Sequence, residues 1–357
     1  MSARIGRRRF LRYAAAGLSV ASLPGAALAQ TAVQRPPTRA TADEFSVTAP
    51  ASIEVNARPI PSFDTRERSR VRFGELEYRS GLVLTSSFRG FGGLSGLRLD
   101  AKGERFIAIS DKAGWFTGRI VYKGREMVGL ADVEASPMLG PDGKPITSRR
   151  WFDSEGLALD GTLVYVGLER VNQVLRFDFS KSFTNAQGEP IALPLAMRKL
   201  PYNKGMEALV MVPKGNQPLA GTLIAISERG LDAQGNILGF LIGGKSPGQF
   251  AVRRSDDFDV SDAVLLPSGS LLVLERKFSW LSGVGIRIRR IALSSIAPGA
   301  LIDGPAIFNA DLGHEIDNME GIDAHVTAEG DTVLTLVSDD NFSLIQRNLL
   351  LQFTLVE

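Results

Sequence analysis

Short apolar runs, separated by turn residues, recur along the chain from about residue 71 to its end. The runs are rich in Val, Ile and Leu, and the segments between them carry turn pairs such as Asp160-Gly161 and Glu329-Gly330. Apolar runs of this length, bounded by such turns, are typical of β-strands and are too short for most helices. The pattern therefore predicts an all-β fold. The clearest runs are 106–110, 163–168, 223–227, 271–274 and 333–338.

The predicted strands follow an internal repeat. Five segments share one pattern, in which a serine, aspartate or glutamate stands before a small residue and an aliphatic one. They are Leu94-Ser95-Gly96-Leu97, Ser154-Glu155-Gly156-Leu157, Met206-Glu207-Ala208-Leu209, Ser261-Asp262-Ala263-Val264 and Met319-Glu320-Gly321-Ile322. The intervals between their second residues are 60, 52, 55 and 58 residues, which leaves room for four strands in each unit. Such units predict a β-propeller with five blades, and six blades or a pair of β-sandwiches are the alternatives.

The two ends of the repeat predict how the ring closes. The last unit reaches Leu355 with only three strand candidates, whereas residues 75–88 carry a strand pattern before the first repeat. An open sheet edge is prone to pair with other chains. We therefore expect the N-terminal strand to close the ring beside the C-terminal blade.

The N-terminal region differs from the rest of the chain. Residues 1–29 combine a basic segment, an apolar run and the small-residue cleavage site Ala27-Leu28-Ala29, which predicts a signal peptide. Arg7-Arg8-Arg9-Phe10-Leu11-Arg12 matches the twin-arginine export pattern, and the apolar run is too short to span a membrane. We expect a periplasmic or secreted protein with no membrane anchor after cleavage. Residues 30–70 are proline-rich and predict a linker or extended arm, followed by one folded domain at 71–357.

The composition excludes several kinds of site and partner. The chain has no cysteine, which excludes disulfides, thiolate metal sites and thiol nucleophiles. It has two histidines, His314 and His325, so that a three-histidine metal site is excluded as well. Basic residues are dispersed and form no nucleic-acid recognition module. We expect a monomer that acts on small molecules.

The net charge changes sign when the export segment is set apart. Of the 41 basic residues, five lie in residues 1–29, which hold no acidic residue. The remaining 36 basic residues face 39 acidic ones, which gives a net charge of −3 in place of +2. The mature protein is expected to be mildly acidic and to bind cations.

Acidic residues recur at two positions of the repeat. One set opens the units and the other ends the second strand of each, and in an antiparallel blade these two points lie at the same end. The first set is Glu155, Glu207, Asp262 and Glu320, with Ser95 in the first unit, and the second set is Asp111, Glu169, Glu228, Glu275 and Asp339. Nine carboxylates around one channel mouth repel one another and need compensating positive charge. Part of it comes from the bases that directly follow second-set acids, namely Lys112, Arg170, Arg229 and Arg276.

Calcium is the cation that these residues favour. Ca²⁺ binds about six to eight hard oxygen ligands, whereas sites rich in histidine or cysteine select transition metals. We therefore expect the nine carboxylates to form a calcium site. The alternative is structural, with the acid–arginine pairs acting as salt bridges that hold neighbouring blades in register.

Five motifs follow one another along the chain: Phe91-Gly-Gly-Leu-Ser-Gly-Leu97, Asp153-Ser-Glu-Gly-Leu157, Met206-Glu-Ala-Leu209, Leu272-Val-Leu-Glu-Arg276-Lys-Phe-Ser279 and Asp317-Asn-Met-Glu-Gly-Ile322. Together they resemble the phytase-like family, whose members are described as having the esterase-like activity of phytase. The resemblance covers about residues 71–357 and implies a propeller related to calcium-dependent phytases. Those enzymes hold calcium ions on carboxylates at the channel mouth and bind phosphate with lysine and arginine.

The resemblance also implies roles for individual residues. The acid of one family motif, Glu followed by Gly or Ala and then Leu or Ile, falls on Glu155, Glu207 and Glu320. The acid of a second motif, Glu followed by Arg, falls on Glu169, Glu228 and Glu275. The first unit departs from these motifs at Ser95 and Asp111-Lys112, and the last departs at Asp339-Asp340. This places a break in the ring symmetry between the first and last blades.

The expected activity is a calcium-dependent phosphoester hydrolysis. Lys112, Arg170, Arg229 and Arg276 are the expected substrate-binding residues, and Glu207 or Glu320 is the expected general base. A metal-assisted carboxylic-ester or lactone hydrolase and a non-catalytic ligand-binding propeller are the alternatives. Gly244-Lys-Ser246-Pro-Gly248 matches the G-x-S-x-G pattern of serine esterases, but its loop context lacks the strand-to-helix elbow, and we interpret it as a chance match.

Overall fold

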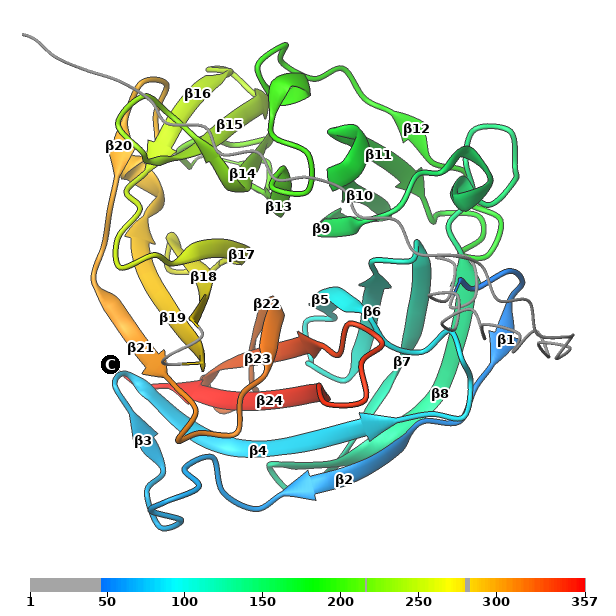
Figure 1. Cartoon of the computed structure of the whole chain (residues 1–357), viewed down its shortest axis with the longest axis vertical. Helices are drawn as coiled ribbons and strands as arrows, with labels where there is room; N and C mark the ends of the chain where they lie inside the picture. Colours follow the sequence, from blue (N-terminus) through cyan, green and yellow to red (C-terminus); the bar gives the residue numbers. More distant parts are fainter. Residues whose placement is uncertain (1–45, 216, 280–282, 357) are drawn as a thin grey trace, which may run out of the picture. The chain divides into compact units, whose positions relative to one another are not determined.

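The computed structural model describes residues 46–215, 217–279 and 283–356. Within them, five sheets of four or more strands surround a central axis (Figure 1). The fold is a five-bladed β-propeller, as the repeat predicts, and the six-blade and β-sandwich alternatives are wrong. The expected signal peptide and the first part of the expected arm lie outside the described residues.

Each blade consists mainly of one repeat unit, written here from the axis outward. Blade 1 contains β5 (Leu94–Leu99), β6 (Arg105–Ser110), β7 (Gly114–Lys123), β8 (Glu126–Pro137) and β1 (Ala51–Ser52). Blade 2 contains β9 (Ser154–Asp160), β10 (Leu163–Leu168), β11 (Gln173–Asp178) and β12 (Glu189–Pro190). Blade 3 contains β13 (Met206–Met211), β14 (Thr222–Leu231), β15 (Ile237–Gly243), β16 (Gly248–Val252) and β20 (Leu301–Ile302). Blade 4 contains β17 (Asp259–Leu265), β18 (Ser270–Ser279), β19 (Gly283–Ala292) and β21 (Ala306–Ala310).

Blade 5 contains strands from both ends of the described chain. They are β22 (Asn318–Val326), β23 (Thr332–Asp339), β24 (Asn348–Leu355), β4 (Leu76–Thr85) and β2 (Asn56–Ile60), with β3 (Arg72–Phe73) beside β4. Four short 3₁₀ turns complete the described elements: η2 (Ile146–Arg149), η3 (Glu169–Val171), η4 (Met197–Lys199) and η5 (Leu293–Ser295).

The ring closes as the sequence predicts. β4 pairs antiparallel with β24, with Gly81 opposite Leu351 and Leu84 opposite Asn348. Farther out, β2 pairs with β4, and β1 pairs with β8 of blade 1. Part of the segment expected as an extended arm therefore contributes sheet strands. The edge of the C-terminal strand is covered, which removes an exposed pairing surface.

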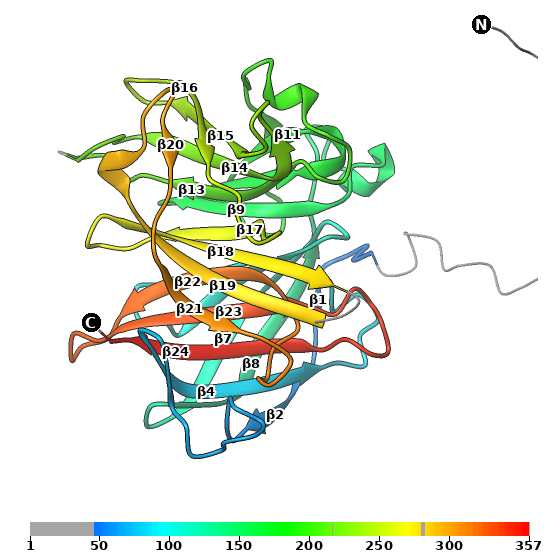
Figure 2. The ribbon, with the colours of Figure 1, turned by 60° about the vertical axis from the view of Figure 1, so that its left-hand side comes forward.

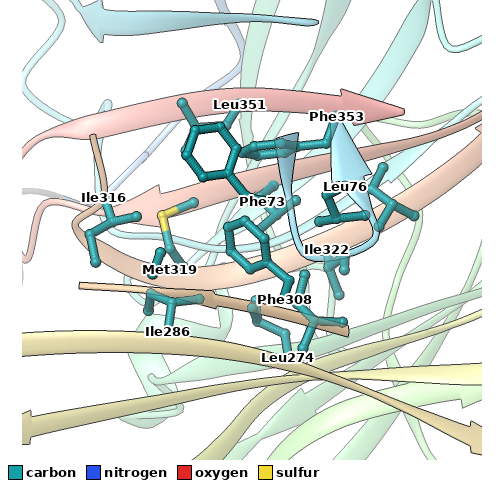
Figure 3. Close-up of a cluster of buried hydrophobic side chains, with 14 of the residues drawn as sticks. Phe73, Leu76, Leu274, Ile286, Phe308, Ile316, Met319, Ile322, Leu351 and Phe353 are labelled. Atoms are coloured by element: carbon teal, nitrogen blue, oxygen red, sulfur yellow. The ribbon is translucent and has the colours of Figure 1, made fainter. Parts of the chain in front are cut away.

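A cluster of buried side chains fills the space between blades 4 and 5 (Figure 3). Leu274 and Phe308 of blade 4 lie in it with Met319 and Phe353 of blade 5. Phe63, from the N-terminal segment, has its ring centroid 5.0 Å from that of Phe353 and 5.8 Å from that of Phe308. Burying one such side chain stabilises the fold by about 1.5–3 kcal/mol. The N-terminal segment is therefore held by core packing as well as by strand pairing.

A β-bulge near the start of the innermost strands directs the side chains there. We call the face at which these strands begin the upper face, and the opposite one the lower face. The bulge residues are Ser95, Glu207, Ser261 and Glu320, and in blade 2 the register shift lies opposite Glu155 and Gly156. The axis is narrow just below, because a Cβ at Gly156 would lie 2.9 Å from the backbone oxygen of Glu207. A bulge re-aims the side chain of the extra residue, here toward the upper face.

Candidate metal centre

Carboxylates from four blades converge on the upper face. They come from the starts of the innermost strands and from the upper ends of the second strands. We call them the acidic cluster, which consists of Glu155, Glu207, Glu320, Asp111, Glu169, Glu228 and Asp339. The structure thus brings together seven of the nine predicted carboxylates.

Three members of the acidic cluster form a compact group. One carboxylate oxygen from each of Glu169, Glu207 and Glu228 lies within 4.8 Å of the other two, and all three residues are buried. The backbone N–H of Gly205 donates to Glu169 Oε1 at 2.8 Å, and Lys204 Nζ donates to Glu228 Oε2 at 2.6 Å. The ligand atoms of this group are all hard oxygens, which is the donor type that Ca²⁺ prefers.

The pKa values of several carboxyl groups in the acidic cluster are raised. Burial is the largest cause and neighbouring carboxylates add to it, so that the pKa of Glu169 reaches about 7 and those of Glu155 and Glu207 lie well above their ordinary value. Burial also raises the pKa of Glu320 to about 7, although Arg276 opposes the shift, and raises the pKa of Asp339. Each shift disfavours the ionised form, and a nearby cation acts in the opposite direction.

In blade 4 the strand pairing is displaced by one residue relative to the sequence repeat. Glu275 pairs with Val260 across the ladder, just as Ser227 pairs with Met206 in blade 3. Glu275 therefore occupies the position that directly precedes the acid in the other blades. Arg276 occupies the position of the acid itself. Because successive side chains of a strand point to opposite faces, this displacement exchanges the directions of the two side chains.

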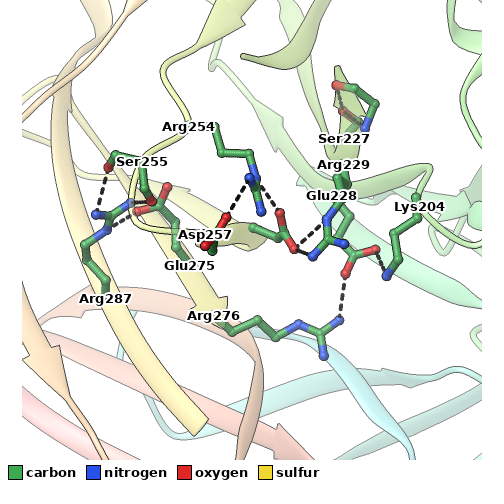
Figure 4. Close-up of polar contacts among 12 residues, drawn as sticks. Lys204, Ser227, Glu228, Arg229, Arg254, Ser255, Asp257, Glu275, Arg276 and Arg287 are labelled. Atoms are coloured by element: carbon green, nitrogen blue, oxygen red, sulfur yellow. Dashed lines mark hydrogen bonds and ion pairs between the residues drawn. The ribbon is translucent and has the colours of Figure 1, made fainter. Parts of the chain in front are cut away.

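Arg276 consequently enters the acidic cluster in place of an acid. Its Nη1 lies 2.7 Å from Glu320 Oε1. Its Nη2 lies 3.5 Å from Glu228 Oε1, as Figure 4 shows. Nη1 also donates to the side-chain oxygen of Asn318, whose Nδ2 donates to Glu320 Oε1 at 2.8 Å. The cluster thus contains one guanidinium among seven carboxyl groups.

Glu275 lies away from the acidic cluster, contrary to the prediction that it joins the nine carboxylates. It is fully buried inside blade 4, where Arg287 Nε donates to its Oε2 at 2.7 Å. Arg289 donates to both of its oxygens, with Nη2 2.5 Å from Oε1 and Nε 2.9 Å from Oε2. Figure 4 shows Glu275 beside Arg287, while Arg276 extends toward Glu228. Its surroundings are those of a structural salt bridge.

Asp262 also lies outside the acidic cluster, which corrects its place in the predicted ring. It follows the bulge residue Ser261 and faces the axis, where Arg98 of β5 binds both carboxylate oxygens at 2.8 and 3.0 Å. Arg98 further donates to the backbone oxygens of Leu209 and Ile322, so that it bridges several blades across the axis. Below this pair, a cavity of about 440 Å³ opens on the lower face.

The predicted substrate-binding bases lie beside acids near the cluster. Lys112 Nζ lies 2.5 Å from Asp111 Oδ2, and Arg229 donates to Asp259 through Nε at 2.8 Å and through Nη2. Arg170 donates from Nε to Asp153 Oδ2 at 2.5 Å, and its terminal nitrogens make no hydrogen bond to any described residue. The residue that the sequence analysis missed is Lys204, three positions before the predicted Glu207.

The two histidines and the serine motif lie elsewhere. The His314 ring packs 5.2 Å from Phe63, and its Nδ1 lies 3.0 Å from Asp311 Oδ1. His325 is buried near the far end of β22. Ser246 is exposed in the turn between β15 and β16, with no helix after it. The structure thus gives Ser246 none of the surroundings that a serine esterase requires.

A five-bladed propeller with a buried multi-carboxylate centre on its upper face is the class of protein that the fold and the site define. The chain belongs to the phytase-like family, described as esterase-like activity of phytase, whose model matches residues 89–342. The resemblance drawn from the sequence motifs is therefore confirmed.

Several solved structures are distantly similar to this chain in fold. A glutaminyl cyclase from Myxococcus xanthus is 11% identical over 87% of this chain and 98% of that chain, with a TM-score of 0.38. The PQQ-bound aldose sugar dehydrogenase from Streptomyces coelicolor is 13% identical over 86% and 99%, with a TM-score of 0.36. No curated protein matches the sequence. Within the described residues, no helix has the length and apolarity needed to cross a membrane.

Proposed function

We propose that the protein is a calcium-dependent phosphoester hydrolase whose centre is the acidic cluster. The observation that carries the proposal is the group of Glu169, Glu207 and Glu228, three buried carboxylates with oxygens within 4.8 Å of one another. Buried carboxylates this close are unfavourable when ionised, unless a cation compensates their charge. A donor set made of oxygens suits Ca²⁺ better than a transition metal. Membership of the phytase-like family supports the same conclusion.

The orphaned oxygen of Glu320 also fits a bound cation or a water molecule. Its Oε1 is held by Arg276 and Asn318, whereas its Oε2 is buried with no hydrogen-bond partner among the described residues. Buried polar atoms are rarely left without a partner. Since Glu207 belongs to the three-carboxylate group, we assign cation binding to Glu207 and proton transfer from the attacking water to Glu320.

The bases beside the cluster are placed to hold a phosphate group. Calcium, when bound, supplies positive charge that offsets the charge of the phosphate and favours ionisation of a water molecule. Arg170 is anchored to Asp153 through Nε, which leaves both terminal nitrogens available for two phosphate oxygens. Arg229, anchored to Asp259, and Lys112, beside Asp111, lie at the ends of the neighbouring blades.

The test is a phosphatase and phosphodiesterase assay on the full chain, with added calcium and with EGTA. We expect turnover that requires calcium and falls at least a hundredfold in Glu207→Gln, whereas Glu329→Gln, an exposed acid on the lower face, retains full activity. Turnover that persists in EGTA would sink the proposal. Calcium-dependent turnover of carboxylic esters alone would favour the ester or lactone hydrolase, and calcium binding without any turnover would favour a ligand-binding propeller.

A further inference from the structure

The most exposed large hydrophobic side chains all lie in segments on the upper face. Among the described residues, six such side chains have exposed fractions between 63% and 106%: Leu195, Tyr202, Phe278, Leu312, Leu344 and Ile345. They stand in loops that lead into an innermost strand, or at or beyond the end of a second strand. We call these six residues the apolar rim. Six side chains exposed to this degree, all on the face that carries the acidic cluster, make this face the candidate interaction surface.

Direct neighbours connect the apolar rim to the acidic cluster. Tyr202 stands two residues before Lys204, which binds Glu228. Phe278 stands two residues after Arg276 on β18, and residues two apart on a strand point to the same side. Leu344 and Ile345 are connected to the acidic cluster through the loop that carries them.

The loop that carries Leu344 and Ile345 covers one side of the acidic cluster. Phe342, two residues before Leu344, has its ring 5.4 Å from Lys112 Nζ, and Lys112 pairs with Asp111 of the cluster. Figure 2 shows the β23–β24 loop and the end of β18 on the same side of the propeller. Leu344 and Ile345 point away from the protein, with exposed fractions of 106% and 89%, and therefore form a protruding tip rather than a pocket wall.

The lower face lacks this feature in the described residues. Its tight turns are short and polar, for example Asp160-Gly161 and 327–331, and its exposed aliphatic residues, such as Val71 at 51% and Val326 at 41%, are less exposed than any residue of the apolar rim. The two faces of the propeller therefore differ in how far their apolar side chains are exposed. The sequence repeat does not account for this difference in exposed apolar side chains, because it places equivalent turns around each face.

Positive charge accompanies the apolar rim. Arg198 and Lys199 are exposed in η4, between Leu195 and Tyr202, and form no ion pair with a described residue. Apolar and aromatic side chains with adjacent lysine and arginine are the pattern of segments that lie in a membrane interface. Each such base near an anionic surface adds attraction, and a cation in the acidic cluster adds more.

We propose that the upper face docks on an anionic phospholipid surface, with the apolar rim inserted between headgroups and a calcium ion of the acidic cluster bridging to a lipid phosphate. The bridging step rests on the proposed function, because it uses the same calcium site. The protein then meets its substrate at a lipid surface, and its substrate class is the phosphoester of a lipid headgroup.

Sedimentation with lipid vesicles tests the docking. The full chain is mixed with vesicles of phosphatidylcholine, with or without phosphatidylglycerol, in calcium or in EGTA, and every variant carries the same residues 1–45. We expect binding to phosphatidylglycerol vesicles in calcium and at least tenfold weaker binding in EGTA or to phosphatidylcholine alone. Leu344→Ser with Ile345→Ser should weaken binding at least tenfold, since each buried apolar side chain of this size changes partitioning by about tenfold or more. Arg198→Gln with Lys199→Gln should weaken it about tenfold or more.

The control is Val326→Ser, which removes an exposed apolar residue from the lower face and should leave vesicle binding unchanged. The rim side chains are exposed, so the thermal unfolding of all these variants should match that of the wild type. Calorimetric titration with calcium alone separates the two proposals: calcium binding without vesicle binding overturns the docking and leaves the proposed function standing. Vesicle binding that is unchanged by EGTA also overturns the docking. So does vesicle binding that is unchanged by Leu344→Ser with Ile345→Ser.

Discussion

Arg276 Nη1 lies 2.7 Å from Glu320 Oε1, so the acidic cluster contains a cation that the chain itself supplies. The same guanidinium reaches Glu228 at 3.5 Å. Arg276 compensates Glu320 most directly, whereas the group of Glu169, Glu207 and Glu228 has its closest base in Lys204 and retains an excess of acid. The chain thus neutralises one part of its carboxylates and leaves the other part for an added cation.

Replacement of Arg276 by methionine tests this division. We expect Arg276→Met to lower the free energy of unfolding by about 2 kcal/mol in EGTA, because it removes the guanidinium from two buried carboxylates and leaves Glu320 with Asn318 and Glu228 with Lys204. Added calcium should recover part of that loss. Urea denaturation with and without calcium measures both effects, and Arg276→Lys, which keeps the charge, is the matched control. Equal stability of Arg276→Met and wild type in EGTA would contradict the assignment.

Glu275, next in sequence to Arg276, should behave as a purely structural acid. Glu275→Gln leaves Arg287 and Arg289 without their buried carboxylate, and we expect a loss of about 3 kcal/mol in the free energy of unfolding. Calcium affinity, measured by calorimetry on the folded variant, should not change. A marked loss of calcium affinity at preserved fold would place Glu275 in the metal centre after all.

The sequence repeat predicts the blades and the closing strand because strand length, turns and alternation are local properties of the chain. The register of blade 4 is harder to predict, since an acid–arginine pair fits the pattern at either of two positions. One signal was available: Ser110, Ser227 and Ser338 precede the acid in three units, and the fourth unit has no serine before Glu275. Reading Glu275 at the serine position would have placed Arg276 in the cluster.

The pairing of Asp262 with Arg98 could not be predicted from spacing. The two residues are 164 positions apart and lie in different blades. Their contact depends on the narrow axis, where the other blades carry Gly96, Gly156, Ala208 or Gly321. Only the closed ring places a long basic side chain of blade 1 opposite an acid of blade 4.

Glu207 should affect calcium binding and stability in opposite directions. Glu207→Gln removes one charged oxygen donor from the three-carboxylate group, and we expect calcium affinity to fall at least tenfold. The same change removes a repelling charge from a buried site, so the calcium-free protein should unfold at a higher urea concentration than the wild type. Calorimetry and urea denaturation in EGTA provide the two readouts. A variant that loses stability along with affinity would indicate a structural role instead.

The stability of the calcium-free protein should fall as the pH rises from about 4.5 to 7. Glu169 has an ordinary pKa of 4.5 that is raised to about 7 in the fold, chiefly by burial, and Glu320 is raised to about 7 in the same way. Between these values the folded chain holds protons that the unfolded chain has lost, so that each rise in pH favours unfolding. The slope should be about 1.4 kcal/mol per pH unit for each excess proton. Bound calcium stabilises the ionised carboxylates and should flatten or reverse this slope. Urea denaturation across the pH range, in EGTA and in calcium, measures both curves, and two parallel curves would mean that calcium does not occupy the acidic cluster.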